Sequence, residues 1–177
     1  MTLAIAHAEG QRAVLDCLVE RRPPFSPDAV TSEFAATRKT YGVRRVVDDR
    51  YRGEWPCERF RAHSVEYGIA ALPKSEIYLD LLVALNSERV ELLDQLRLLA
   101  QLGGLERRAV RSRRDIVDHA PNAHDDLANA AAGVVTLVCA AASPALQVFA
   151  VEVGKSTTSP HGLPAYGPRV AASLRGE

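Results

Sequence analysis

The sequence of 177 residues predicts an α/β domain in which helices pack on the faces of a mixed β-sheet. Two observations predict it. An opening β-hairpin is indicated by apolar alternation on both sides of a turn, and short apolar runs then alternate with segments of helical apolar spacing. The composition, 47% hydrophobic and 25% charged, is that of an ordinary globular protein. Because the formal net charge is zero, any attraction to a polyanion must come from local clusters of charge.

The predicted strands begin with the hairpin. Residues 2–7 and 13–19 form its two strands, with a turn at Glu9-Gly10-Gln11. Three later strands are predicted from short apolar runs at residues 43–48, 65–72 and 90–93.

The predicted helices have recognisable ends. Ser26-Pro27-Asp28 combines a capping serine, a proline at the first helical position and an acid near the positive end of the helix dipole. Gly42 ends this helix. Further helices are predicted at about residues 54–63, 75–86, 96–105 and 124–142, and a loop or hairpin at residues 107–119.

These elements predict one domain over residues 1–153. Residues 154–177 are rich in Pro, Gly and Ser without periodicity, so we expect a flexible tail. The apolar stretch at residues 127–151 is interrupted by Asn129 and Pro144, which favours a buried helix and no membrane span.

The three cysteines are far apart and form no C-x-x-C pair. They indicate neither a zinc site nor a disulfide framework, and a reducing cytosol is the simplest setting.

Acidic residues at two places are candidates for catalysis and metal binding. Asp49 follows a predicted strand, at the edge of an α/β sheet where ligands usually bind, and Asp125 and Asp126 begin the last predicted helix. Carboxylates that meet in one cleft can hold divalent cations, and two such ions about 4 Å apart can hydrolyse a phosphodiester. The alternative is structural: Asp49 is a turn residue, and the aspartate pair caps the helix.

Arginines cluster near both acidic places. Five lie within residues 107–114, and four surround Asp49. Such clusters suit a phosphate backbone that crosses a metal site, although a solvated charged loop is the alternative. The candidate DNA-binding residues are Arg50, Arg52, Lys74, Arg107, Arg108, Arg111, Arg113 and Arg114. His119 and His124 flank the acidic pair and are candidates for orienting an aspartate or for capping.

Several stretches, in this order and spacing, resemble the C-terminal nuclease domain of phage and prophage large terminases. They are Phe25-Ser26-Pro27, Val46-Val47-Asp48-Asp49-Arg50-Tyr51, Gly53-Glu54-Trp55, Lys74-Ser75-Glu76-Ile77-Tyr78, Arg89-Val90-Glu91-Leu92-Leu93-Asp94, Gly104-Leu105-Glu106-Arg107-Arg108, Asp118-His119-Ala120-Pro121 and His124-Asp125-Asp126-Leu127-Ala128-Asn129-Ala130. The resemblance covers roughly residues 2–142.

The resemblance implies an RNase H-like fold and a Mg²⁺- or Mn²⁺-dependent endonuclease that cleaves concatemeric double-stranded DNA during genome packaging. It implies Asp49 as the second metal-binding acid and Asp126, or its neighbour Asp125, as the third. It also implies the portal and the small terminase subunit as partners, in the cytoplasm of a bacterial host.

The sequence departs from this family at its beginning. The family's first metal-binding aspartate lies on a strand that would precede residue 1 and that is central in the sheet, between the hairpin and the parallel strands. We therefore expect residues 2–7 to lack one pairing partner, metal ions to bind weakly, and plasmid cleavage with Mn²⁺ to be slight or absent. The alternative function is a catalytically inactive prophage remnant that binds DNA or a packaging partner.

Overall fold

The computed structural model describes residues 1–49, 60, 65–109, 115–141, 147–151 and 169–171. Its strands are β1 (Thr2–Glu9), β2 (Arg12–Glu20), β3 (Arg45–Asp48), β4 (Glu66–Ile69), β5 (Val90–Leu93), β6 (Leu105–Arg108), β7 (Ile116–His119), β8 (Gln147–Val151) and β9 (Arg169–Ala171). Its helices are α1 (Pro27–Thr40), α3 (Lys74–Asn86), α4 (Leu96–Gly103) and α5 (Asp126–Ala140).

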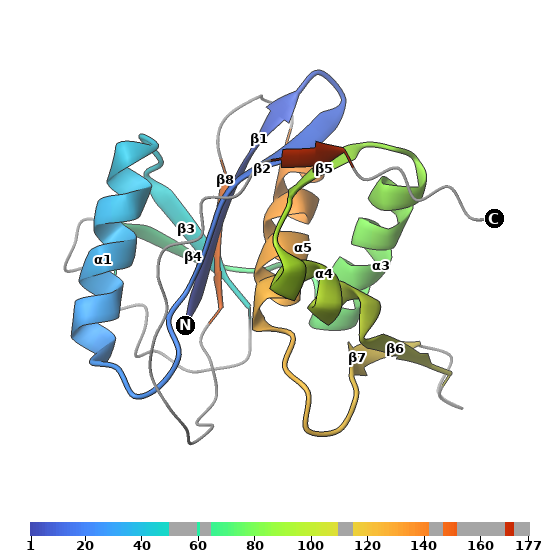
Figure 1. The fold of residues 1–177 in the computed structure, drawn as a ribbon. Helices are drawn as coiled ribbons and strands as arrows, with labels where there is room; N and C mark the ends of the chain where they lie inside the picture. The colour runs from blue at the N-terminus through green and yellow to red at the C-terminus, as the bar shows by residue number, and fades with distance from the viewer. Residues whose placement is uncertain (50–59, 61–64, 110–114, 142–146, 152–168, 172–177) are drawn as a thin grey trace.

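The main sheet has seven strands in the order β4-β3-β8-β1-β2-β5-β9 (Figure 1). Strands β1 and β2 form an antiparallel hairpin, and β5 lies parallel to β2. Strands β3 and β4 are parallel to each other, and β8 joins them to the hairpin. The sheet is therefore mixed, as the sequence predicts. Strands β6 and β7 form a separate antiparallel pair.

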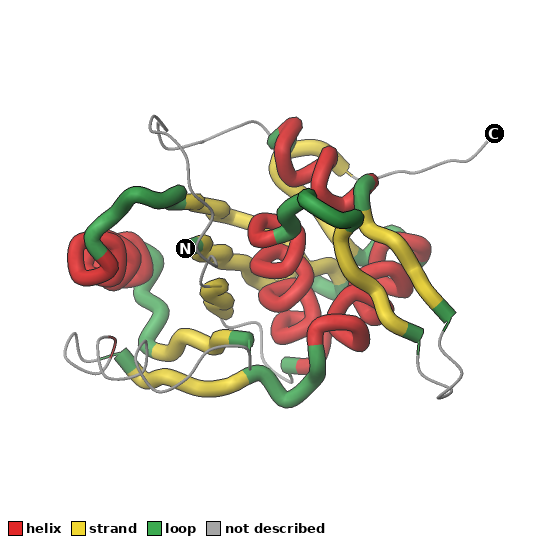
Figure 2. Tube along the Cα trace, turned by 90° about the horizontal axis from the view of Figure 1, so that it is seen from below, coloured by secondary structure: helices red, strands yellow, loops and turns green. Residues whose placement is uncertain are grey.

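Helices cover both faces of this sheet. Helix α1 lies on one face, and α3, α4 and α5 lie on the other (Figures 1 and 2). Each face has its own core. On the α1 side, Phe34 packs with Ile5 and Val46, and on the α5 side, Leu127 packs with residues that include Phe149.

Local signals explain the helix that the sequence locates best. The Ser26 hydroxyl accepts a hydrogen bond from the Ala29 amide at 3.5 Å, and Pro27 is the first helical residue. The helix ends at Thr40, and Gly42 follows with a φ of +69°. That backbone conformation favours glycine, which explains why the chain turns there.

Most of the predicted elements are confirmed within the described residues. Helix α4 ends at Gly103, two residues before the predicted end, because Leu105 already pairs with His119 in the β6–β7 hairpin. The helix predicted at residues 54–63 lies outside the described residues except for residue 60.

One expectation about strands is wrong. Residues 2–7 do not lack a partner, because β8 pairs with β1 over Thr2–Ala6 on the side opposite β2. Within the range predicted as a tail, the described residues 169–171 form β9, which pairs antiparallel with β5. Within the described part of the chain, no helix is both long enough and apolar enough to cross a membrane.

Candidate metal centre

The first acidic position lies where β3 ends. Asp48, the last residue of β3, is buried, and its carboxylate accepts hydrogen bonds from the Asp49 amide at 2.8 Å and from the Tyr67 hydroxyl at 2.5 Å. The Asp49 carboxylate, in contrast, accepts a hydrogen bond from the Asn129 side-chain amide at 2.7 Å. The Asp48 carboxylate therefore makes hydrogen bonds at the sheet, to the Asp49 amide and to Tyr67 of β4, whereas the Asp49 carboxylate makes its hydrogen bond to α5.

Asn129 connects Asp49 to the beginning of α5. It lies one turn after Asp126, at the i+3 position, and residues at this spacing share a helix face. Three residues of α-helix rise about 4.5 Å along the axis. Asp49 and the first turn of α5 therefore lie on the same side of the molecule, although they are 77 positions apart in the sequence.

Helix α5 is not capped by its own aspartates. Asp125 is the N-cap residue, but its side chain makes no capping hydrogen bond. Instead, the side-chain oxygen of Gln101, which lies on α4, accepts hydrogen bonds from the amides of Leu127 at 2.8 Å and Ala128 at 3.0 Å. Asp125 therefore does not cap the helix by a hydrogen bond, because Gln101 satisfies these amides, whereas Asp126 lies in the first turn, where an acid complements the helix dipole.

The two adjacent aspartates have different surroundings. The Asp125 carboxylate is 9% exposed and contacts the Tyr78 hydroxyl and the Lys74 ammonium, both at 2.7 Å. It is thus neutralised from α3. Asp126 is only partly buried, and no described group donates a hydrogen bond to its carboxylate. Burial raises the pKa of Asp126; the Met1 amino group opposes this rise, and Asp125 adds to it.

A second acidic cluster lies on the other side of Asp125. Asp118, His119 and Asp125 each place one possible ligand atom within 4.8 Å of the others. Lys74 already occupies this cluster, with its ammonium 2.7 Å from a carboxylate oxygen of both Asp118 and Asp125. Burial alone would lower the pKa of Lys74, but these two hydrogen bonds outweigh it and raise the pKa. A lysine cation therefore balances the charge that a metal ion would otherwise balance.

The oxygen atoms near Asp49 suit a hard divalent cation. Carboxylates come from Asp49 and Asp126, and the buried Asn129 adds an amide oxygen to which no described residue donates a hydrogen bond. Mg²⁺ and similar ions take carboxylate and amide oxygens as ligands. A buried amide oxygen without a hydrogen-bond donor is costly unless a cation or water satisfies it. We call Asp49, Asp126 and Asn129 the candidate metal centre.

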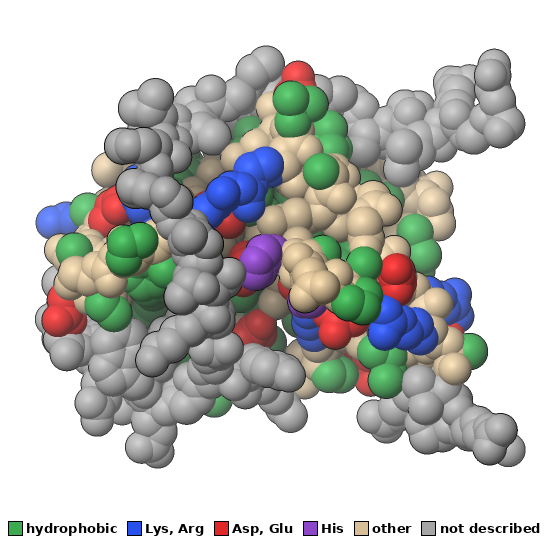
Figure 3. Space-filling model, turned by 60° about the horizontal axis from the view of Figure 1, so that its bottom comes forward, with side chains coloured by type: hydrophobic (Ala, Val, Ile, Leu, Met, Phe, Trp, Pro, Cys, Tyr) green, Lys and Arg blue, Asp and Glu red, His purple; other side chains and the backbone are tan. Residues whose placement is uncertain are grey.

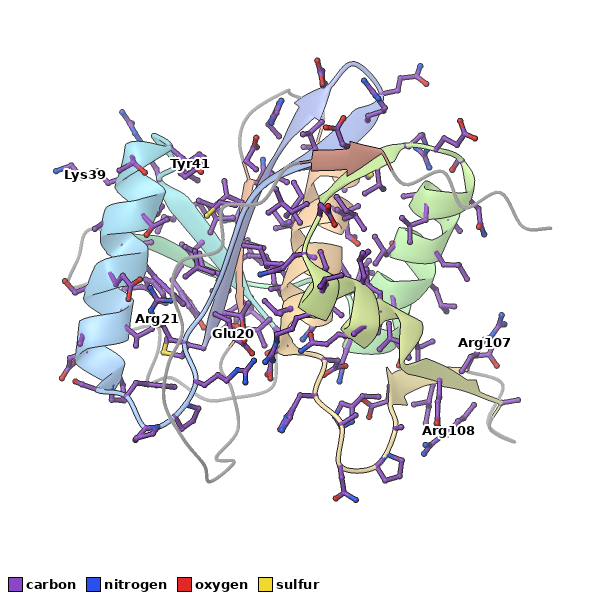
Figure 4. The ribbon with its side chains drawn as sticks, in the orientation of Figure 1. Glu20, Arg21, Lys39, Tyr41, Arg107 and Arg108 are labelled. Carbon is purple, nitrogen blue, oxygen red and sulfur yellow. The ribbon has the colours of Figure 1, made fainter. Side chains whose placement is uncertain are left out.

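The predicted DNA-binding residues are only partly described. Arg107 and Arg108 extend from β6, where Asp115 and Glu106 pair with them (Figure 4). The Lys74 ammonium is paired with Asp118 and Asp125 within the acidic cluster, so these carboxylates compete with a DNA phosphate for it. The others lie outside the described residues; they are Arg50, Arg52, Arg111, Arg113 and Arg114.

The surface around the acidic residues carries both signs of charge. On the face shown in Figure 3, acidic and histidine side chains gather near the middle, and Lys and Arg side chains lie on both sides of them. His124 is exposed, and His119 bonds through Nδ1 to the Ala120 carbonyl at 2.9 Å. The hydrogen bond to the Ala120 carbonyl orients the His119 ring, and the Nε2 atom of His119 lies 4.0 Å from the Asp125 carboxylate.

Sequence reasoning missed three residues of this region: Asn129, Gln101 and Tyr78. Only Asn129 carried a signal, because a buried asparagine in an alanine-rich helix is costly unless it has a specific partner. Gln101 and Tyr78 act across the fold, and nothing near them in the sequence indicates it.

Comparisons with known proteins agree with the fold. No protein-family model and no curated protein matches the sequence. Three crystal structures of the large terminase nuclease from thermophilic phage G20c are similar to the chain. One has a TM-score of 0.59 and 18% identity and covers 73% of this chain and 80% of that chain. The structures with bound magnesium and with bound cobalt have a TM-score of 0.60 and identities of 18% and 17%, each covering 76% of this chain and 80% of that chain.

At these identities the similarity establishes the fold. The resemblance that the sequence motifs indicate is thus present in three dimensions: the chain has the fold of the phage large terminase nuclease domain, an RNase H-like mixed sheet flanked by helices.

Proposed function

We propose that the chain is a metal-dependent endonuclease domain of a phage or prophage large terminase, which cleaves concatemeric double-stranded DNA during genome packaging. One observation carries the proposal: the hydrogen bond between Asn129 and Asp49 brings the acid after β3 to the first turn of α5, whose own aspartates are not used for capping. In this proposal the portal and the small terminase subunit are the packaging partners, and the host cytoplasm is the location.

Asp49 and Asp126 are the proposed metal ligands, and the metal is Mg²⁺ or Mn²⁺. Two bound ions would activate a water molecule and stabilise the leaving oxygen of the phosphodiester. Asn129 orients Asp49 through its amide hydrogen atoms. Asp125 is assigned to structure, because Lys74 and Tyr78 already satisfy its carboxylate. The arginines near Asp49 and on β6 would contact phosphates.

The similarity to metal-bound terminase nucleases supports a divalent cation. Of the similar structures, one contains bound magnesium and one contains bound cobalt. In this chain the carboxylates come from separate elements, and partial burial raises the pKa of Asp126 despite the nearby Met1 amino group. A divalent cation would supply further positive charge beside this carboxylate.

The test compares the wild type with Asp49→Asn, Asp126→Asn and Asp118→Asn. We expect Mn²⁺ to raise the melting temperature of the wild type, and this effect to vanish in the first two variants. Asp118→Asn, in the cluster that Lys74 occupies, is the matched control and should respond like the wild type. If Asp118→Asn alone loses the response, the ion binds in the other cluster and the site assignment is wrong.

A second function has one observation in its favour. The resemblance implies three metal-binding acids, whereas two are proposed here among the described residues, Asp49 and Asp126. An inactive remnant that binds DNA or a packaging partner through its arginines would fit this. Slow plasmid nicking with Mn²⁺ that is lost in Asp49→Asn supports the nuclease, whereas DNA binding in a gel shift without any nicking supports the remnant.

A further inference from the structure

Strand β8 occupies a position that the family resemblance assigns to another part of the chain. It pairs antiparallel with β1 from Thr2↔Val151 to Ala6↔Gln147, and parallel with β3 at Val47↔Phe149 and Asp48↔Ala150. This is the place between the hairpin and the parallel strands, where the family's first strand is expected. Figure 1 shows β8 between β1 and β3. The sheet is thus continuous, with its central strand supplied by residues 147–151.

The side chains of β8 belong to both cores. Val148 and Ala150 pack on the α1 side, and Phe149 and Val151 pack on the α5 side. All four are at most 5% exposed. Both faces of β8 are buried, and both of its edges are paired, with β1 and with β3. Strand β8 is therefore an interior strand of the sheet and part of the core.

Phe149 has a matching partner on α5. A Cβ atom added to Gly133 would lie 2.5 Å from three ring atoms of Phe149, so the ring rests directly on the glycine backbone. A glycine inside a helix costs about 1 kcal/mol relative to alanine. The close approach of the Phe149 ring explains why a glycine is present at this helical position.

Phe149 connects the two elements of the candidate metal centre. Its backbone pairs with Val47 of β3, two residues before Asp49, and its ring rests on Gly133 of α5, one turn after Asn129. The ring therefore limits how closely α5 approaches β8, the strand to which β3 is paired. The Asn129 Nδ2 atom donates a hydrogen bond to Asp49 Oδ2 at 2.7 Å. A shift of about 1 Å between α5 and the end of β3 would break this hydrogen bond.

We propose that Phe149, on the strand that lies between β1 and β3, is a positioning residue for the candidate metal centre. The Phe149 ring holds the end of β3 at the distance from α5 at which Asp49 and Asp126 bind one cluster of ions. This inference rests on the proposed function, because it assigns Phe149 a role in that same site.

The test uses the full chain and a matched pair of variants. Phe149→Leu removes ring atoms between β8 and α5. Phe34→Leu makes the same change in the core on the α1 face, where Phe34 is 0% exposed. Mn²⁺ affinity is measured by the enhancement of water proton relaxation, at a temperature where circular dichroism shows every variant folded. Asp49→Asn reports the proposed function itself.

We expect Phe149→Leu to weaken Mn²⁺ binding at least fivefold, and Phe34→Leu to leave it within twofold, even where both variants lose similar thermal stability. Equal Mn²⁺ affinity in Phe149→Leu and the wild type overturns the positioning role, while the Asp49-dependent signal still supports the proposed function. A wild type without any Asp49-dependent signal overturns the proposed function and this inference together.

Discussion

Substitution of Gly133 by alanine should destabilise the protein, although alanine is the better helix former. Propensity favours alanine by about 1 kcal/mol. The new Cβ atom would lie 2.5 Å from three atoms of the Phe149 ring, and this ring is 1% exposed and has no room to rotate away. Overpacking of this kind costs about 1–3 kcal/mol. If overpacking costs about 3 kcal/mol and helix propensity returns about 1 kcal/mol, the free energy of unfolding falls by about 2 kcal/mol. For a chain of this size, that corresponds to a decrease of about 4–8 °C in melting temperature.

Removal of the ring should reverse the sign. Phe149→Ala alone costs about 3–5 kcal/mol. In this background, Gly133→Ala keeps its propensity gain of about 1 kcal/mol and partly fills the cavity. The effect of the second substitution therefore changes from about 2 kcal/mol unfavourable to about 1 kcal/mol favourable, which is a coupling of about 3 kcal/mol.

Urea unfolding of the four proteins measures this coupling from the transition midpoints, provided that the m-values agree. Phe34→Ala supplies the control background. Its ring belongs to the other core cluster, so Gly133→Ala should be as destabilising there as in the wild type. If Gly133→Ala stabilises the wild type, or has one effect in every background, the contact between ring and glycine does not limit packing and the argument fails.

Two further predictions concern the start of α5 and the acidic cluster beside it. Gln101→Leu removes the acceptor for the amides of Leu127 and Ala128 and should lower the free energy of unfolding by about 0.5–2 kcal/mol. Gln101→Glu keeps an acceptor oxygen and should retain most of that free energy. Equal losses in the two variants would contradict the capping role of Gln101. Burial opposes ionisation of Asp118, but hydrogen bonds from Lys74 and the His119 amide outweigh it and lower the Asp118 pKa. A lowered carboxyl pKa stabilises the fold above the unfolded value of about 3.9, and this contribution disappears as pH falls through the folded value. Thermal melts of Asp118→Asn should therefore differ from wild type at pH 7 and converge with it near pH 2; a difference independent of pH would rule out the ion pair as its source.

The parts of the fold that could be predicted from the sequence carry local signals. The β1–β2 hairpin has its turn at Gly10, with a φ of +62°, and α1 has Ser26 and Pro27 at its start. Strand β8 has no such signal. It is a run of five residues after an alanine-rich helix, and its neighbours in the sheet are set by burial against segments more than a hundred positions away.

The candidate site could be predicted in outline only. The sequence indicates that Asp49 and the aspartate pair belong to one site, but it does not distinguish Asp125 from Asp126. Asp125 is the non-helical N-cap residue and Asp126 is the first helical residue, and of the two carboxylates only that of Asp125 contacts Lys74 and Tyr78. Which one faces the lysine depends on how α5 is rotated against α3, and this is a property of the whole fold.

The late position of β8 in the chain also bears on how the protein is made. Thr2 pairs with Val151, 149 positions later, so β1 leaves the ribosome long before its partner β8 is synthesised. Until then, both β1 and β3 present an open edge to other nascent chains. Contacts over such long separations slow folding, and domains of this size expose apolar surface while they wait. Chaperone dependence during synthesis, and aggregation of chains that stop short of residue 147, follow from this single strand.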